Sequence, residues 1–436
     1  MIASLLGFVA LFALVLVRIP IAFSMIIVGT AGFALLRTWK ASLTLTGNAA
    51  FDTVLSFTLS VIPLFVLMGN FLTISGVSDA LFSTAHRFLH RLRGGLAMST
   101  VVACGGFSAV CGSSLATAAT MSKVAMPTMR KAGYSDSLAT GSIAAGGTLG
   151  ILIPPSVVLI IYGLLTEADI GKLFVAGILP GLLGVVMYVL AVAVTVRLRP
   201  ELAPTEVDRT PMTARDIRGV VLVVALFTVI MVGIYGGIFS PSEAAAIGAL
   251  SAALIAATTP GMTFAAMLAA CVDTARTSAM IFALIIGAQI FSNFVSYAGL
   301  PAAILEWVSA MDIGPFTVIF VLVLIYLVLG AVLESLSMIL LTVPVFYPLV
   351  MSLDFGAGWL GDPTNVAIWF GILVVVVTEI SLISPPIGLN VFVLRSVLHD
   401  VPLATIFKGI LPFWIADLIR LGLLIALPAL SLLLIG

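Results

Sequence analysis

Long apolar runs, separated by short polar breaks, follow one another along almost the whole chain. A run of about 20 apolar residues is long enough to cross the hydrocarbon core of a bilayer as a helix. The runs long enough for whole or tilted spans are residues 2–17, 20–36, 53–74, 137–165, 173–196, 219–238, 243–258, 264–297, 363–398 and 403–435. The pattern predicts an all-α integral membrane protein with many crossings.

Two further apolar stretches are interrupted near their middles. Residues 94–126 contain Gly112-Ser113-Ser114, and residues 314–350 contain a polar break between Gly330 and Ser337. A membrane segment cannot leave its backbone groups unpaired in hydrocarbon, so such breaks belong where the chain turns inside the protein. We therefore expect each stretch to enter the membrane and return on the same side, as a re-entrant helical hairpin.

The landmarks of the first half of the chain return in the second half in the same order. Pro20 and Pro241 each open a helix rich in small residues, and a hairpin stretch follows. A Pro-Pro pair then interrupts a long apolar run at 154–155 and again at 385–386. A proline inside a helix costs about 3 kcal/mol, and one pair alone would be explained by a packing kink. Two pairs in matching positions predict two structural repeats.

Residues 197–218 form the one strongly polar stretch, with three prolines and nine charged residues at mid-chain. If this linker is cytoplasmic, 14 of the 19 Lys and Arg residues fall on the cytoplasmic side and three on the other, as the positive-inside rule requires. The same count places the two hairpins on opposite sides and both termini outside. The predicted divisions are therefore two inverted repeats, residues 1–197 and 219–436, joined by a cytoplasmic linker, 198–218.

Composition excludes several classes of protein. With 61% hydrophobic and 9% charged residues, the chain is not a soluble globule. A formal net charge of zero gives no reason to expect nucleic-acid binding. The sequence contains no GxxxxGK[ST] loop, so ATP hydrolysis is not indicated. The three cysteines, Cys104, Cys111 and Cys271, lack metal-type spacing and are interpreted as small core residues.

Backbone carbonyls freed by the Pro-Pro breaks are candidate cation ligands. They are the carbonyls around Gly150, Ile153 and Pro155 in the first half, and around Ser381, Ser384 and Pro386 in the second. Such groups must face protein, water or a cation, and carbonyl oxygens at half-helix ends suit a hard cation such as Na⁺. The N–H groups at half-helix N-termini suit a carboxylate instead.

The hairpin breaks offer hydroxyls, exposed backbone and one carboxylate. They comprise Gly112, Ser113, Ser114, Thr117 and Thr120 in the first hairpin, and Glu334, Ser335, Ser337 and Thr342 in the second. Ser and Thr alone more often hold membrane helices together, but facing the Pro-Pro breaks they favour a binding site. Glu334 and Glu379 sit in apolar surroundings, where an acidic group is a functional hypothesis by default. Each could bind a cation, carry a proton, or cap a broken helix end.

Several segments resemble one known family in the order in which they occur. RIPIAF at 18–23, CGSSLATAATM at 111–121, GILIPPS at 150–156, GIFSPSEAAAIGA at 237–249 and SPPIGLNVF at 384–392 resemble the large membrane subunit, of the DctM or SiaM type, of tripartite ATP-independent periplasmic (TRAP) transporters. The likeness runs through nearly the whole chain.

This resemblance implies a secondary transporter rather than an enzyme. Such proteins import an organic anion, are coupled to Na⁺, use no other cofactor, and are thought to move a transport domain past a scaffold like an elevator. The implied partners are a small four-helix membrane subunit of the DctQ type and a periplasmic substrate-binding protein of the DctP type. The implied location is the bacterial inner membrane, with multiple passes through the lipid bilayer.

The family's binding sites can be assigned to this sequence at the positions where its motifs match. The first implied Na⁺ site comprises Cys111, Gly112, Ser113, Ser114, Gly150, Ile153 and Pro155. The second comprises Glu334, Ser337, Ser381, Ser384 and Pro386. The implied substrate residues are Ser113, Thr117, Thr120, Ser335 and Asn390. Many relatives carry Asp where this chain has Glu334, and an acidic residue where it has Thr117.

Two alternatives differ in class. The first is a standalone anion:Na⁺ or anion:H⁺ symporter that needs no binding protein. The second is an intramembrane enzyme that uses Glu334 or Glu379 as a base, which would need histidines or a metal cluster at membrane depth. The carried anion is not specified by the sequence, because selection in such systems would rest largely with the binding protein.

Overall fold

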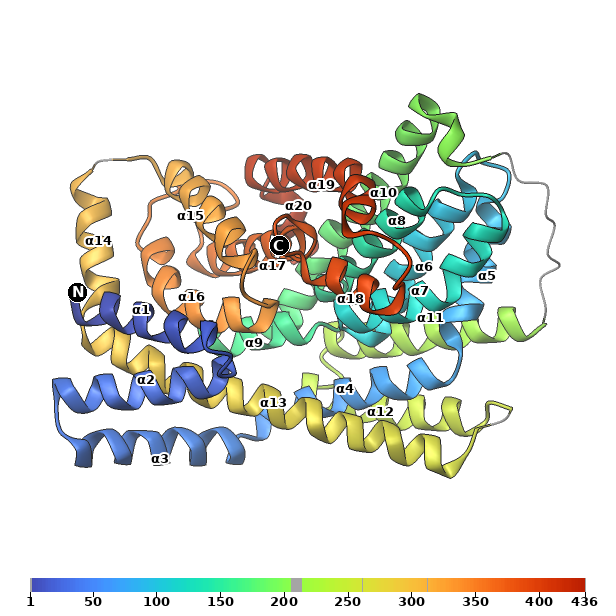
Figure 1. The fold of residues 1–436 in the computed structure, drawn as a ribbon. Coiled ribbons are helices and arrows are strands. Elements are labelled where there is room, and N and C mark those ends of the chain that lie inside the picture. Colours follow the sequence, from blue (N-terminus) through green and yellow to red (C-terminus); the bar gives the residue numbers. More distant parts are fainter. Residues whose placement is uncertain (1, 205–213, 261, 312, 436) are drawn as a thin grey trace.

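The computed structural model of the protein describes residues 2–204, 214–260, 262–311 and 313–435, the side chains of 214–216 excepted. These residues form helices joined by turns and loops, with no strand among them (Figure 1). Up to the linker the helices are α1 (Ile2–Leu16), α2 (Ile21–Leu36), α3 (Trp39–Leu55), η1 (Phe57–Ser60), α4 (Val61–Ile74), α5 (Val77–Leu89), α6 (Gly95–Cys111), α7 (Ser114–Lys131), α8 (Asp136–Thr148), η2 (Leu149–Ile151), α9 (Val157–Thr166), α10 (Ile170–Leu198) and η3 (Pro200–Leu202).

After the linker the same kinds of element follow again. They are α11 (Ala214–Tyr235), α12 (Pro241–Ala257), α13 (Phe264–Tyr297), α14 (Leu300–Ala310), α15 (Pro315–Gly330), α16 (Ser335–Met351), α17 (Pro363–Ile383), α18 (Leu389–Val397), α19 (Leu403–Ala426) and α20 (Ala429–Leu432). Six segments of the described chain are long and apolar enough to cross a membrane, among them α10, α13 and α17. The protein is therefore a multi-pass membrane protein.

Both predicted hairpins and both predicted helix breaks are present. In the first hairpin α6 ends at Cys111 and α7 starts at Ser114, and in the second α15 ends at Gly330 and α16 starts at Ser335. The two helices of each hairpin pack against each other. The first Pro-Pro pair separates η2 from α9, and the second separates α17 from α18. Both Pro-Pro peptide bonds are cis.

Local sequence explains where several helices begin. Ser240 precedes α12 and its hydroxyl accepts a hydrogen bond from the Glu243 N–H, while the Glu243 carboxylate accepts one from the Ser240 N–H. With Pro241 in the first turn, this capping box fixes the start of α12. Thr263 caps α13 in the simpler way, accepting from the Ala266 N–H.

Helices of the two halves pair across the molecule instead of forming separate lobes. α2 packs on α13, α4 packs on α12, and α8 packs on α19. Small residues bring the first pair close: a methyl group on Gly29 would stand 2.8 Å from the Phe291 N atom, and one on Gly287 would stand 2.6 Å from the Ala22 O atom. Close approach through glycine is typical of membrane helix pairs.

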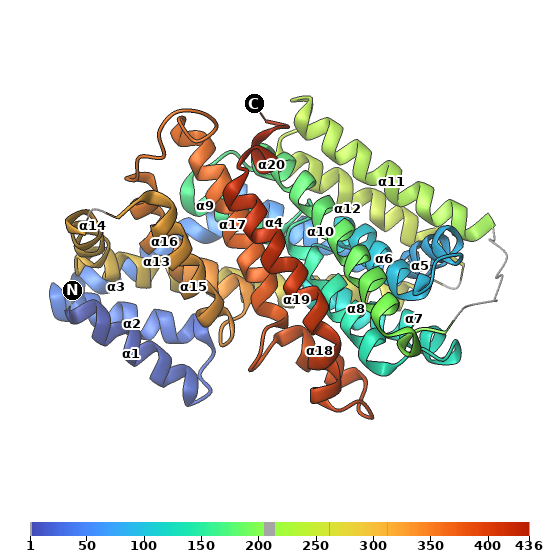
Figure 2. The ribbon, with the colours of Figure 1, turned by 90° about the horizontal axis from the view of Figure 1, so that it is seen from above.

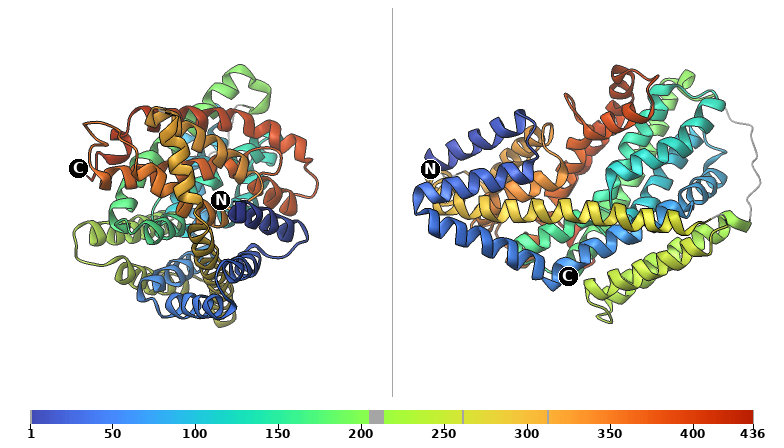
Figure 3. Two further views of the ribbon diagram at one scale, coloured as in Figure 1. Left: turned by 90° about the vertical axis from the view of Figure 1, so that its left-hand side faces the viewer. Right: turned by 60° about the horizontal axis from the view of Figure 1, so that its bottom comes forward.

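These pairs form two layers. α2, α3, α4, α12 and α13 make the lower layer in Figure 1, with α8, α10, α17 and α19 above it. The right-hand view of Figure 3 shows α13 extending from α2 and α3 at one end to α12 at the other. Seen from above, α17 and α19 run side by side through the centre (Figure 2). α17 is the core helix, since its whole membrane-length window is buried.

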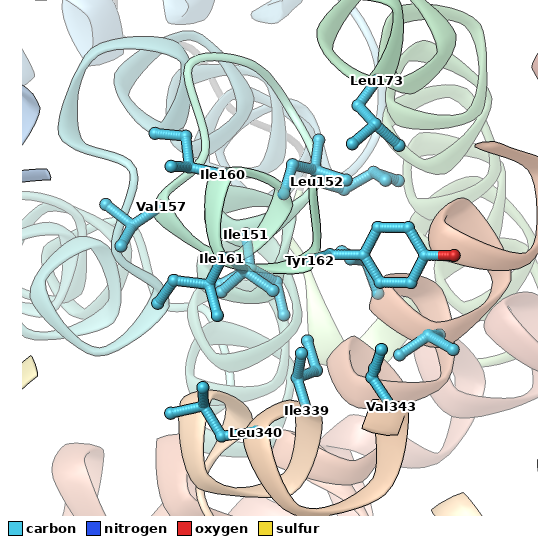
Figure 4. Packing of buried hydrophobic residues seen from close by; sticks show 14 of the residues in the cluster. Ile151, Leu152, Val157, Ile160, Ile161, Tyr162, Leu173, Ile339, Leu340 and Val343 are labelled. Atoms are coloured by element: carbon cyan, nitrogen blue, oxygen red, sulfur yellow. The ribbon is translucent and has the colours of Figure 1, made fainter. Parts of the chain in front are cut away.

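Each broken helix packs against the hairpin of the other half. α9 lies on α16, where the Ile161 side chain points toward Leu340 (Figure 4). α18 lies on α7 in the corresponding way. The two hairpins and the two broken helices therefore pack as one block.

Two helices, α3 and α14, were not predicted. The apolar run expected at 53–74 is divided among the end of α3, η1 and α4, and α3 itself starts at Trp39. α14 occupies a stretch with no predicted span. Both helices carry polar or charged side chains on exposed faces, such as Lys40, Asp52 and Glu306, so hydropathy alone does not reveal them.

Candidate functional site

The tips of both hairpins line one cavity of about 220 Å³ at the centre of the molecule. Cys111, Gly112, Ser113 and Ser114 line it from the first tip, and Glu334 and Ser335 from the second. Ile151 and Val157 flank the first break, and Leu382 and Leu389 flank the second. The remaining wall comes from α4 and α13, including Asn70 and Thr277. The cavity thus lies between the hairpin block and the lower layer.

The first tip lies directly on the first helix break. Gly112 has φ +62°, and a methyl group there would stand 3.0 Å from the Pro155 carbonyl oxygen. A methyl group on Gly150 would stand 3.1 Å from the carbonyl carbon of Ser113. Only glycine allows this backbone contact at Gly112, because positive φ is strained for other residues. The structure therefore brings most of the first predicted ion site together.

Ile153 is placed differently from its neighbours. Its side chain points between α6 and α10, where it lies beside Gly105 and Gly181. Its backbone N–H donates to the Leu149 carbonyl. Only its backbone, not its side chain, is therefore available to a site at the break.

The second tip places a carboxylate in the cavity. Glu334 is half-buried and precedes the first residue of α16, yet its side chain accepts no capping hydrogen bond from the helix. The Ser337 hydroxyl donates to Glu334 Oε1 at 3.1 Å. Among the described residues that line the cavity, Glu334 carries the one charged side chain. The Glu334 carboxylate therefore does not cap α16, which leaves cation binding and proton transfer as its possible roles.

The second break is held by hydrogen bonds within α17 and by α19. The Ser381 hydroxyl donates to the Val377 carbonyl at 2.9 Å, and the Ser384 hydroxyl donates to the Ile380 carbonyl at 2.7 Å. Ser384 Oγ also accepts from Trp414 Nε1 at 2.8 Å. Unlike Pro155, which is buried, Pro386 is exposed.

The five predicted substrate residues divide into two groups. Ser113 and Ser335 line the cavity. Thr117, Thr120 and Asn390 do not line it. Thr117 is fully buried one turn into α7, and its hydroxyl has no hydrogen-bond partner within the described chain. Asn390 is also fully buried and donates to the Ala144 carbonyl at 3.0 Å, so its amide ties α18 to α8.

This arrangement of hairpins and broken helices has a match among known families. The model of the "Tripartite ATP-independent periplasmic transporter, DctM component" matches residues 8–430. The chain belongs to the DctM family. Its members are transporter permease subunits, so the chain is not an enzyme.

Curated relatives of this DctM-family chain cover most of its length. It is 34% identical over 386 residues to the C4-dicarboxylate TRAP transporter large permease protein DctM of Pseudomonas aeruginosa, covering 88% of this chain and 87% of that one. It is 28% identical over 435 residues to the sialic acid TRAP transporter large permease protein SiaM of Vibrio cholerae, covering 100% and 98%.

A solved structure shows the same fold at low sequence identity. The YdaH transporter of Alcanivorax borkumensis, described as having an unusual topology, matches with a TM-score of 0.59 and 18% identity, over 90% of this chain and 89% of that one. At this identity the likeness concerns the fold alone.

One group of functional interest in this DctM-family chain lies outside the cavity. Glu379 forms an ion pair with Arg420, and Asp417 Oδ1 lies 2.9 Å from Arg420 Nη2. The Tyr188 hydroxyl donates to Asp417 Oδ2 at 2.6 Å. All four residues are fully buried. Glu379 is paired and does not line the cavity, so the role observed for it is to link α17 to α19.

Asn70 was missed by sequence reasoning. Its Nδ2 donates to Thr274 Oγ1 at 2.9 Å, linking α4 to α13 beside the cavity. A lone amide within an apolar run was the available signal, because polar side chains at membrane depth face the protein interior.

Proposed function

We propose that the protein is the membrane subunit of a Na⁺-coupled transporter that imports an organic anion delivered by a periplasmic binding protein. The observation that carries this proposal is a cavity lined by both hairpin tips and by residues next to both helix breaks. Named substrates of the relatives, C4-dicarboxylate and sialic acid, support a carboxylate as the transported group.

The first Na⁺ would lie at the contact between the first tip and the first break. Cys111 to Ser114, Gly150 and Pro155 bring backbone oxygens close together here, and Ile153 would add its carbonyl. Hard cations take oxygen ligands, and broken membrane helices supply them from carbonyl ends. Binding there would hold the first tip against the break.

The second Na⁺ would lie beside Glu334 and Ser337. The Glu334 carboxylate supplies a full negative charge, which the first site lacks. Ser381, Ser384 and Pro386 would contribute from the second break. Both serine hydroxyls donate to carbonyls within α17. Ser381 Oγ keeps its lone pairs for a cation, and Ser384 Oγ, which also accepts from Trp414, keeps one.

Charge explains why the ion and the anion would move together. An anionic substrate entering the cavity meets the Glu334 carboxylate, and two like charges 4 Å apart repel by about 4 kcal/mol at an effective dielectric constant near 20. Na⁺ beside Glu334 removes that repulsion. The helices α7 and α16 start at the cavity, at Ser114 and Ser335. The N–H groups at these two helix N-termini attract a carboxylate. Ser113 and Ser335 would contact it, with Thr117, Thr120 and Asn390 behind them.

The proposed motion is an elevator movement of the hairpin block past the lower layer. Support comes from the packing of α9 on α16 and of α18 on α7, which makes the hairpins and broken helices one unit. The cavity lies between that unit and α4 with α13. The two halves, 1–197 and 219–436, would be inverted repeats, each giving one hairpin and one broken helix. Part of the linker at 198–218 lies outside the described residues.

The family is tripartite by description, so two further proteins are expected in general. For this chain we propose a small four-helix membrane subunit and a periplasmic binding protein, in a bacterial inner membrane. A standalone symporter is the alternative. Uptake of C4-dicarboxylates and sialic acid into proteoliposomes, with each candidate partner omitted in turn, distinguishes the two. Our proposal requires both partners and an inward Na⁺ gradient; full uptake by this chain alone contradicts it.

A further inference from the structure

A second cavity, of about 560 Å³, lies in a groove between α10 and α19. None of its residues lines the cavity at the hairpin tips. Its walls include Leu190, Val194 and Leu198 from α10, and Leu411, Ile415 and Ile419 from α19. These six side chains are 48% to 77% exposed. Each set recurs every four residues, so each forms a row along one helix face.

The groove has a basic end. Arg199 follows the last residue of α10, and Lys408 lies near the start of α19. Both line the groove at the end where Leu198 stands. Both are exposed, and neither forms an ion pair with another residue of the described chain. Their charges are therefore available to a ligand.

A smaller polar cavity of about 320 Å³ continues from this end. It shares Thr195, Arg199 and Lys408 with the groove and adds Glu201. The apolar slot thus opens into a pocket with two basic groups, one hydroxyl and one carboxylate. This pocket attracts an anion and also offers acceptors to hydroxyl groups of the same ligand.

The dimensions match one leaflet of a bilayer. From Leu198 to Leu190 the groove follows eight residues of α10, which is about 12 Å of helix. Half of the hydrocarbon core is about 15 Å. An acyl chain that enters at the basic end would therefore stay within one leaflet and keep its headgroup beside Arg199 and Lys408.

We propose that this groove binds an anionic phospholipid from the surrounding membrane. One acyl chain lies between the rows of α10 and α19, and the phosphate contacts Arg199 and Lys408. Basic pockets at the ends of membrane helices recognise such headgroups. A glycerol headgroup places its hydroxyls towards Glu201 and Thr195, so phosphatidylglycerol is the lipid that fits best.

Native mass spectrometry of the delipidated full-length protein, titrated with phosphatidylglycerol, tests the proposal. We expect saturable binding that phosphatidylcholine matches only at concentrations about tenfold higher. The double variant Arg199→Gln/Lys408→Gln should weaken phosphatidylglycerol binding by about tenfold. Val194→Trp, which fills the slot without touching the charges, should weaken it as well. Arg197→Gln and Lys172→Gln are controls, because both side chains are exposed and line neither cavity.

Three results would overturn the proposal. Equal binding of the two lipids, or unchanged binding in the double variant, would show that Arg199 and Lys408 do not bind the headgroup. Competition by inorganic phosphate, together with no effect of Val194→Trp, would show an anion site without a lipid. Thermal unfolding of each variant confirms that it is folded, and since all the substituted side chains are exposed, their loss should leave the fold intact.

Discussion

The Cα of Gly150 at the first helix break faces the backbone of Ser113 at the first hairpin tip, with too little room between them for a methyl group. A methyl group on Gly150 would stand 3.1 Å from the Ser113 carbonyl carbon and 3.2 Å from its oxygen. Two segments nearly 40 residues apart thus share one backbone surface. If this surface holds Na⁺, its spacing sets the affinity for the ion.

Gly150→Ala should therefore weaken Na⁺ binding without unfolding the protein. The added methyl group pushes the tip away by a few tenths of an ångström, and a loss of about 1 kcal/mol raises the half-saturating Na⁺ concentration about fivefold. The measurement is uptake as a function of Na⁺ concentration. Gly422→Ala on α19 is the matched control, since nothing lies within 4 Å of its methyl position. Equal Na⁺ curves for the two variants would refute the assignment.

Ser113→Ala and Glu334→Gln test the two proposed ion sites separately. Each should raise the half-saturating Na⁺ concentration, by about tenfold for Glu334→Gln because it removes a full charge. Glu306→Gln serves as the control, since Glu306 is exposed on α14 and does not line the cavity. Wild-type Na⁺ dependence in both site variants would mean that the sites are misplaced.

Gly330→Ala should destabilise the second hairpin. A methyl group at Gly330 would overlap both Ser381 Cβ and Ser381 Oγ. Overpacking of this kind typically costs about 1–3 kcal/mol. Adding Ser381→Gly removes both clashing atoms, so the double variant should regain part of the lost stability, as a double-mutant cycle on thermal unfolding would report. No recovery in the double variant would show that α15 and α17 are not in contact at Gly330 and Ser381.

Arg420→Met should be strongly destabilising. It leaves the carboxylates of Glu379 and Asp417 buried without their shared partner, at a cost of about 3–5 kcal/mol. Asp417→Asn should cost less, because the pair of Glu379 with Arg420 remains. The control is Arg276→Met, at an exposed position of α13. The prediction is checked by thermal unfolding in detergent, and equal stability of Arg420→Met and Arg276→Met would contradict it.

The features that could be predicted from sequence are the helices and helix breaks whose signal lies within one short stretch of the chain. The helix over 264–297 agrees with α13, and the breaks at Gly112-Ser113 and at both Pro-Pro pairs are where glycine, serine and proline indicate them. A hairpin tip and a broken helix each carry their own local signal. Their meeting in one cavity also followed from the repeated order of these signals.

Individual side-chain pairings between distant helices could not be predicted. Glu379 and Arg420 are 41 residues apart, and their pairing depends on α17 lying beside α19. Without that packing, the sequence left Glu379, like Glu334, open to binding a cation, carrying a proton or capping a broken helix end. Thr117, Thr120 and Asn390 were grouped with the tip residues by motif. The structure places both Thr117 and Asn390 in the packed interior. Thr117 lies one helical turn beyond the first tip, and Asn390, at the start of α18, donates to the Ala144 carbonyl of α8.

The most direct test of the account is the uptake of radioactive Na⁺ into proteoliposomes that contain this chain with its partner subunits. We predict that adding binding protein loaded with the transported anion accelerates Na⁺ uptake, and that Glu334→Gln strongly reduces this acceleration at the Na⁺ concentration that half-saturates the unsubstituted protein. Na⁺ uptake that does not change with substrate, while substrate itself is still transported, would contradict the claim that ion and anion share the cavity between the hairpin tips.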